Sequence, residues 1–168
     1  MRYSDYEVVV RVVGSIDEAS YREFSETPAL DTKDTSVLVE LNSDGGLAVQ
    51  ALAFVSRMRL APQTIAVLGI GEVCSAATII LAAGTRGHRF LTKESWVMTH
   101  EDSGKIKGTV SQMESEVRTA RRLEDQWCYL MGKYTRVSAK AWKKMNASGD
   151  VYLNPKECLT MGLIDEIV

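Results

Sequence analysis

The chain alternates short apolar runs, rich in β-branched residues, with segments whose apolar residues recur at helical spacing. Val8–Val13, Ser36–Leu41 and Thr64–Leu68 are the apolar runs, and the first two end at turns that contain glycine. The segments between them, Ile16–Phe24 and Leu47–Met58, have helical character, and a proline follows each one closely. The pattern predicts three buried strands joined by two helices.

The second half of the chain adds a small buried helix, a short strand and one long amphipathic helix. Ala76–Ala83 is almost entirely apolar and follows a glycine-rich turn after Leu68, which predicts a fully buried helix. Trp96–Thr99 has the length and composition of a short strand. From Thr109 as far as Leu130, apolar residues recur at three- and four-residue steps. This repeat predicts a long helix with one apolar side.

The C-terminal residues carry the signals of a capped helix followed by a strand. Asn154, Pro155 and Glu157 stand at the positions of a cap, a first helical proline and a reciprocal glutamate, and Gly162 follows the last turn. Leu163–Val168 then predicts a final strand. Strands that alternate with helices predict one α/β domain over residues 1–168 with a mostly parallel sheet. Ligands of such sheets bind at the carboxyl ends of the strands, so the functional turns are expected after the second and third strands.

Composition argues against several classes of protein. The 168 residues include 22 acidic and 20 basic side chains, a balance that does not favour nucleic acid or an anionic membrane as partner. The three cysteines, Cys74, Cys128 and Cys158, are odd in number and lack a Cys-x-x-Cys spacing, which argues against disulfides and a zinc cluster. The N-terminus lacks the form of a secretory signal, and no apolar stretch approaches the roughly 20 residues of a membrane span. We therefore expect a soluble cytoplasmic protein.

Only two histidines could act as a general base, His88 and His100. His88 lies in a loop between glycine and arginine, where a protonated ring would be disfavoured. His100 ends an apolar strand, which fixes a side chain better than a loop does. His100 is the stronger candidate.

The turn before the small buried helix places a hydroxyl, Ser75, between a strand and a helix made of tiny residues. A helix that starts at Ala76 would aim backbone N–H groups at a group bound beside Ser75, as an oxyanion requires. The alternative interpretation, and the commoner one for a serine at such a place, is a helix cap. Cys74 has no basic neighbour in sequence and is expected to pack as a small apolar residue.

Taken together, these turns resemble the ClpP family of caseinolytic serine peptidases. Members carry an N-S-P-G-G turn, a G-x-x-x-S-M-G turn before an L-A-A-G helix, a strand ending V-M-I-H, and a D-R-F-L-S segment before a final G-L-V-D. The resemblance runs from about Val8 to the C-terminus. The matching segments here are Asn42 to Gly46, Gly71 to Ala77, Leu81 to Gly84, Val97 to His100, Asp150 to Asn154, and Gly162 to Asp165.

The resemblance implies a serine endopeptidase that forms an acyl-enzyme. Ser75 would be the nucleophile, His100 the base and Asp150 the carboxylate that orients the histidine. The backbone N–H groups of Gly46 and Ala76 would form the oxyanion hole. This mechanism requires no metal and no cofactor.

The resemblance also implies a fold and an assembly. The fold would be the ClpP/crotonase-like superhelix of repeated βαβ units, with a strand-helix handle protruding over about residues 101–131. Family members form homo-oligomers of two stacked seven-fold rings that enclose the active sites. The substrates would then be peptides or unfolded proteins, and an AAA+ ATPase would be a partner that delivers them.

This sequence departs from the family pattern at several positions, and these departures leave other functions open. Asp44 replaces the turn proline, Ala76-Ala77 replaces Met-Gly, and Glu101-Asp102 follows the histidine in place of Gln-Pro. The segment before the first strand is short, which weakens the case for an ATPase partner and suggests a divergent, phage- or plasmid-encoded member that matures capsid or scaffold proteins. The sequence also leaves open a non-catalytic ring subunit and a crotonase-like acyl-CoA enzyme.

Overall fold

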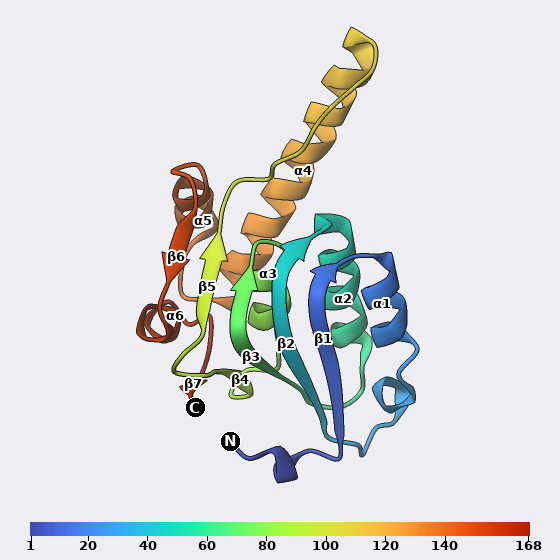
Figure 1. Cartoon of the computed structure of the whole chain (residues 1–168), viewed down its shortest axis with the longest axis vertical. Helices are drawn as coiled ribbons and strands as arrows, with labels where there is room; N and C mark the ends of the chain where they lie inside the picture. Colours follow the sequence, from blue (N-terminus) through green and yellow to red (C-terminus); the bar gives the residue numbers. More distant parts are fainter.

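The chain folds into a seven-stranded sheet with its main helices on one face, and one helix extends beyond it (Figure 1). A computed structural model describes all 168 residues. In chain order the strands and α-helices are β1 Val8–Ile16, α1 Glu18–Ser25, β2 Val37–Gly46, α2 Ala48–Leu60, β3 Ile65–Cys74, α3 Ala77–Ala83, β4 Arg89–Leu91, β5 Trp96–Thr99, α4 Val110–Tyr134, α5 Ala139–Asn146, β6 Val151–Leu153, α6 Pro155–Met161 and β7 Glu166–Ile167. Two short 3₁₀ helices, η1 Tyr3–Asp5 and η2 Pro28–Asp31, flank the first βα unit.

The sheet is parallel except at one edge. The strand order is β1-β2-β3-β4-β7, while β5 pairs with β3 in parallel and with β6 antiparallel. The units β1-α1-β2, β2-α2-β3 and β3-α3-β4 follow one another, which confirms the predicted repetition of βαβ units. The long strand β3 pairs with β4 through Val67 to Gly69 and then with β5 through Glu72 to Cys74.

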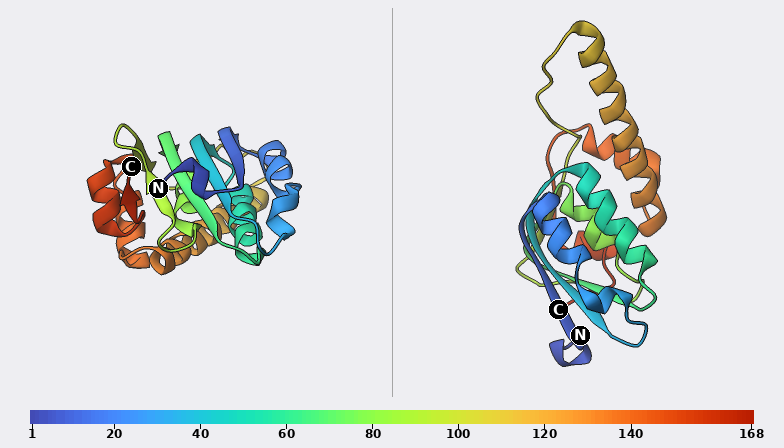
Figure 2. Two further views of the ribbon diagram at one scale, coloured as in Figure 1. Left: turned by 90° about the horizontal axis from the view of Figure 1, so that it is seen from below. Right: turned by 90° about the vertical axis from the view of Figure 1, so that its right-hand side faces the viewer.

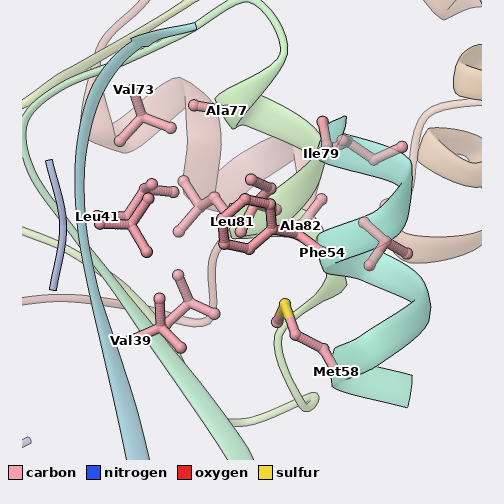
Figure 3. Close-up of a cluster of buried hydrophobic side chains, with 14 of the residues drawn as sticks. Val39, Leu41, Phe54, Met58, Val73, Ala77, Ile79, Leu81 and Ala82 are labelled. Atoms are coloured by element: carbon pink, nitrogen blue, oxygen red, sulfur yellow. The ribbon is translucent and has the colours of Figure 1, made fainter. Parts of the chain in front are cut away.

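The core lies between the sheet and helices α1 to α3. Both views in Figure 2 show these helices on the same side of the strands. Side chains of β2 alternate across the sheet: Val37, Val39 and Leu41 join the large core, whereas Leu38 faces a smaller apolar cluster on the other side. Figure 3 shows the large core, where Val39, Leu41 and Val73 of the sheet meet apolar side chains of α2 and α3.

Helix α4 forms the projecting part of the molecule together with residues 101–108. At about 1.5 Å per residue, its 25 residues span roughly 37 Å. Its N-terminal half has only exposed side chains apart from Ala120, whereas Cys128 and Met131 near the other end are buried in the core. Residues 101–108 run outward from β5 beside α4 (Figure 1) without pairing as a strand, so the strand part of the expected handle is extended chain only. None of the helices has the length and apolar character needed to cross a bilayer.

The structure corrects several of the predicted elements. The glycine-rich segment after Leu68 is not a turn, because β3 continues to Cys74 by pairing with β5. The first helix begins at Glu18, since Ile16 is fully buried in β1 and Asp17 caps the helix by accepting from the N–H of Ser20. The last strand is only Glu166–Ile167. Helix α5 and strands β4 and β6 were not predicted.

Candidate active site

Ser75 lies on a sharp turn between β3 and α3. It is the only non-glycine residue with a positive φ, +51°, a conformation that costs on the order of 1–3 kcal/mol and must be held by its surroundings. The N–H of Ser75 donates to the carbonyl of Met98 at 2.7 Å, and the hydroxyl of Thr78 donates to the same carbonyl at 3.2 Å. The turn is therefore fixed to strand β5.

His100 follows directly after β5. Its Nε2 lies 2.8 Å from Ser75 Oγ, within hydrogen-bond distance. Because Met98 on the same strand holds the backbone of Ser75, β5 positions both side chains. An imidazole nitrogen this close to a hydroxyl can accept its proton as the oxygen attacks an electrophile.

His88 lies near the amino-terminal ends of β3 and β4. It precedes β4, and its carbonyl accepts from the N–H of Val67 near the start of β3, whereas Ser75 follows the end of β3. The preference for His100 over His88 is therefore in accord with the geometry.

Asp150 is exposed, and its side chain makes no hydrogen bond or ion pair within the chain. It stands immediately before β6, where Thr99 of β5 pairs with Val151 of β6. The pairing ends there; continued by one step, this antiparallel register would set His100 opposite Asp150, and the Cβ atoms of such opposite residues lie roughly 4.5–5.5 Å apart. The strand register thus directs Asp150 toward His100, while its carboxylate forms no hydrogen bond with the imidazole.

Gly46 and Ala76 line the same small hollow as Ser75 and His100, about 50 Å³ in volume. Ala76 is only 6% exposed, and its backbone N–H makes no hydrogen bond within the chain. A nearly buried N–H without a partner is uncommon and is available to a bound oxygen. Gly45, beside Gly46, packs so tightly against the turn that an added Cβ would lie 2.7 Å from Ser75 Cβ.

The remaining walls of the hollow come from residues that were not predicted as site residues, although Asp102 was noted as a departure from the family pattern. They are Ala48 of α2, Thr99 of β5, Asp102 in the segment before α4, three residues of α4 (Leu123, Glu124 and Trp127), and Asn146 of α5. The apolar side of α4 could be predicted from its repeat. That Asn146 would be buried here could not, because a polar residue at the end of a short, lysine-rich helix gives no sign of burial.

Cys74, the other candidate nucleophile, lies where a thiolate is disfavoured. Burial raises the pKa of the Cys74 thiol to about 11, and the nearby charge of Glu72 acts in the same direction. Cys74 therefore remains a neutral thiol near pH 7 and packs as an apolar side chain. No three His, Cys, Asp or Glu side chains are grouped as ligands for a metal.

Fold and site together define a class of protein: a parallel α/β domain with a serine on a strained strand-to-helix turn and a histidine within hydrogen-bond distance. Comparison with known families matches residues 5–168 to the Clp protease family, and the chain belongs to that family. It is 29% identical over 138 residues to the ATP-dependent Clp protease proteolytic subunit 4 of Rhodococcus jostii (strain RHA1), a match that covers 82% of this chain and 71% of that protein. The family is one of serine peptidases, and membership agrees with the predicted fold.

Proposed function

We propose that this protein is a serine endopeptidase in which Ser75 Oγ attacks the scissile carbonyl of a peptide. The observation that carries the proposal is the 2.8 Å separation of Ser75 Oγ and His100 Nε2 at a strained turn. His100 takes the hydroxyl proton during the attack and returns it to the leaving amine. The acyl-enzyme that results is hydrolysed by water in the second half of the reaction, with His100 again as base.

The oxyanion of the tetrahedral intermediate is taken by the backbone N–H groups of Ala76 and Gly46. The free N–H of Ala76 and the position of both residues in the lining of the Ser75 hollow support this assignment. Donors that are fixed before the reaction stabilise developing charge without reorganising, which typically contributes about 3 kcal/mol per donor.

Asp150 is proposed to orient His100 from its side of the β5-β6 pair. Its place opposite His100 in the strand register supports the assignment, since rotation of one side chain would turn the carboxylate toward the imidazole. A carboxylate on Nδ1 holds the ring in the tautomer that presents Nε2 to the serine and stabilises the imidazolium that forms.

The substrates proposed are peptides and unfolded proteins, cleaved inside a homo-oligomeric chamber of one or two seven-fold rings. Family membership supports an oligomeric ring. An AAA+ ATPase is proposed as a partner for delivery, by analogy with the Rhodococcus jostii subunit, whose name describes a component of an ATP-dependent protease.

Labelling with a fluorophosphonate probe, followed by peptide mass spectrometry, tests the proposal. We expect a covalent adduct on Ser75 that disappears in His100→Ala and persists in His88→Ala, the matched control with the other histidine. Asp150→Asn should lower peptide hydrolysis by a factor on the order of 10⁴. If the assembled protein fails to label at Ser75, it is a non-catalytic ring subunit instead.

A further inference from the structure

The hollow beside Ser75 is lined in part by Asn146, a buried polar side chain that the proposed chemistry does not use. Asn146 is 2% exposed, and its Oδ1 accepts a hydrogen bond from Thr99 Oγ1 at 2.8 Å. Its amide nitrogen, Nδ2, has no partner in the chain. The only fully buried side-chain nitrogen or oxygen without a partner is Gln63 Oε1, so Asn146 Nδ2 must reach open space. The hollow that Asn146 lines is the one shared by Ser75 and His100.

The other walls combine apolar surface with carboxylates. Leu123 and Trp127 of α4 form an apolar side, and Glu124 and Asp102 bring two carboxylates to the same lining. Burial raises the pKa of Glu124, and the charges of Glu101 and Asp102 act in the same direction, whereas Lys143 opposes them. A volume of about 50 Å³ leaves room for only a few non-hydrogen atoms, since a single water needs roughly 10–15 Å³ by the same kind of measure.

The hollow should accept some classes of substrate side chain better than others. An aliphatic side chain would leave the buried amide of Asn146 without a partner, which is costly. An acidic side chain would meet two carboxylates. A lysine ammonium would be attracted by Glu124 and Asp102, but it carries no acceptor and would leave Asn146 Nδ2 unpaired. A carboxamide offers an oxygen to Asn146 Nδ2 and an N–H to Glu124.

We propose that this hollow is a specificity pocket that selects glutamine or asparagine at the substrate residue preceding the cleaved bond, with Asn146 as the selecting side chain. The inference rests on the proposed function and adds its substrate class. A site that hydrogen-bonds a substrate group discriminates strongly against analogues that lack it, because its own polar group is then left unpaired.

The test uses the assembled full-length protein and fluorogenic peptides that differ only at the residue before the scissile bond: Gln, Asn, Leu, Lys or Glu. We expect kcat/KM for Gln to exceed that for Leu by at least about tenfold, the factor that corresponds to about 1.4 kcal/mol. In Asn146→Leu the Gln-to-Leu ratio should fall below one. In Glu124→Gln, kcat/KM for the Glu peptide should rise relative to kcat/KM for the other peptides.

Ratios of kcat/KM within one variant do not depend on the fraction of protein that is folded, so a loss of stability in Asn146→Leu leaves the measurement valid. Fluorophosphonate labelling of Ser75 is measured on the same samples. If Ser75 is labelled but the Leu and Gln peptides are cleaved with equal kcat/KM, the pocket assignment is wrong and the proposed function stands. Absence of labelling in the unmodified protein would overturn the proposed function and the pocket assignment with it.

Discussion

At the scale of single residues, the position of Ser75 depends on the absence of a side chain at Gly45. Gly45 has φ +106°, and an added Cβ would lie 2.7 Å from Ser75 Cβ and 2.8 Å from the carbonyl oxygen of Cys74. Both contacts are shorter than real Cβ atoms tolerate, and the Cys74 oxygen belongs to the backbone. The two turns therefore fit only while residue 45 is glycine.

Gly45→Ala should displace Ser75 as well as destabilise the fold. We expect a loss of about 2 kcal/mol or more in the free energy of unfolding, from the positive φ and the collision together, and reduced fluorophosphonate labelling. Gly14→Ala is the matched control: φ is +83° there, with nothing within 4 Å of the added Cβ. It should incur only the conformational cost, about 1 kcal/mol, and keep full labelling. Urea unfolding and mass spectrometry measure both effects, and equal labelling in the two variants would contradict the collision argument.

At the scale of elements, the last strand is joined to the sheet by a buried ion pair. Arg89 of β4 donates to Asp165 through Nη2 at 2.6 Å and Nε at 2.8 Å, and its side chain is only 4% exposed. The N–H of Gly87 also donates to Asp165, at 2.7 Å, and Arg89 Nη1 donates to the carbonyl of Tyr134 in α4 at 2.8 Å. One arginine thus ties β4, the segment before β7 and the end of α4 together.

Asp165→Asn should weaken this junction in a pH-dependent way. Burial alone would raise the pKa of Asp165, but the hydrogen bonds and charge of Arg89, with the N–H groups of Gly87 and Arg89, outweigh it and lower the pKa. A lowered folded-state pKa stabilises the protein above the unfolded value, about 3.9, and this stability is lost as the pH falls through the folded value. We expect the variant to lose about 3 kcal/mol at pH 7, because it leaves the Arg89 charge unpaired.

The difference between Asp165→Asn and the unmodified protein should narrow as the pH falls below about 4, because the unfolded chain takes up the Asp165 proton there and the folded protein only at lower pH. Urea unfolding at pH 7 and in acid measures it. Glu166→Gln, at the neighbouring and exposed position, is the control and should change stability by less than about 0.5 kcal/mol at either pH. A difference that stayed constant with pH would contradict the charge argument.

Sequence patterns predicted the helices and strands that form because of their own residues. Helix α6 has its capping box, and α4 has an apolar repeat long enough to be unambiguous. Strands β4 and β6 have three residues each and form by pairing with strands that are distant in sequence. The local sequence therefore gives little signal for them. Helix α5 is anchored mainly by Trp142, one buried aromatic with polar neighbours. Its signal was the Ser138 cap, which accepts from the N–H of Ala141.

The same division applies to the candidate site. Ser75 and His100 follow strands that run side by side, and the order of motifs was enough to predict that they meet. Asn146 could not be found in this way, since its burial arises from the docking of α5 under Thr99. The orientation of the Asp150 carboxylate is likewise a matter of one side-chain rotation in an exposed turn, which sequence does not encode.

At the scale of the whole molecule, the projecting part of α4 carries an unburied apolar surface. Val110 is 68% exposed, and Met113 and Val117, which share its side of the helix, are 36% and 39% exposed. Ile106 in the extended segment beside α4 is also exposed. Contiguous apolar side chains on a projecting helix are typical of a surface that a partner covers. In an oligomeric ring protease, such a surface suits the contact between two rings.

In the proposed double ring, charge placed on this surface should separate the two rings. We expect the unmodified protein to sediment as a double ring, and Met113→Glu/Val117→Glu to sediment as a species of half that mass, because burying two carboxylates at an apolar contact costs more than the contact contributes. Ser115→Glu adds a carboxylate on the opposite side of α4 and should leave the mass unchanged. Circular dichroism would show that α4 stays helical in each variant. Sedimentation velocity decides the outcome: a double ring in the paired variant would show that the Met113 and Val117 side of α4 is not the ring contact.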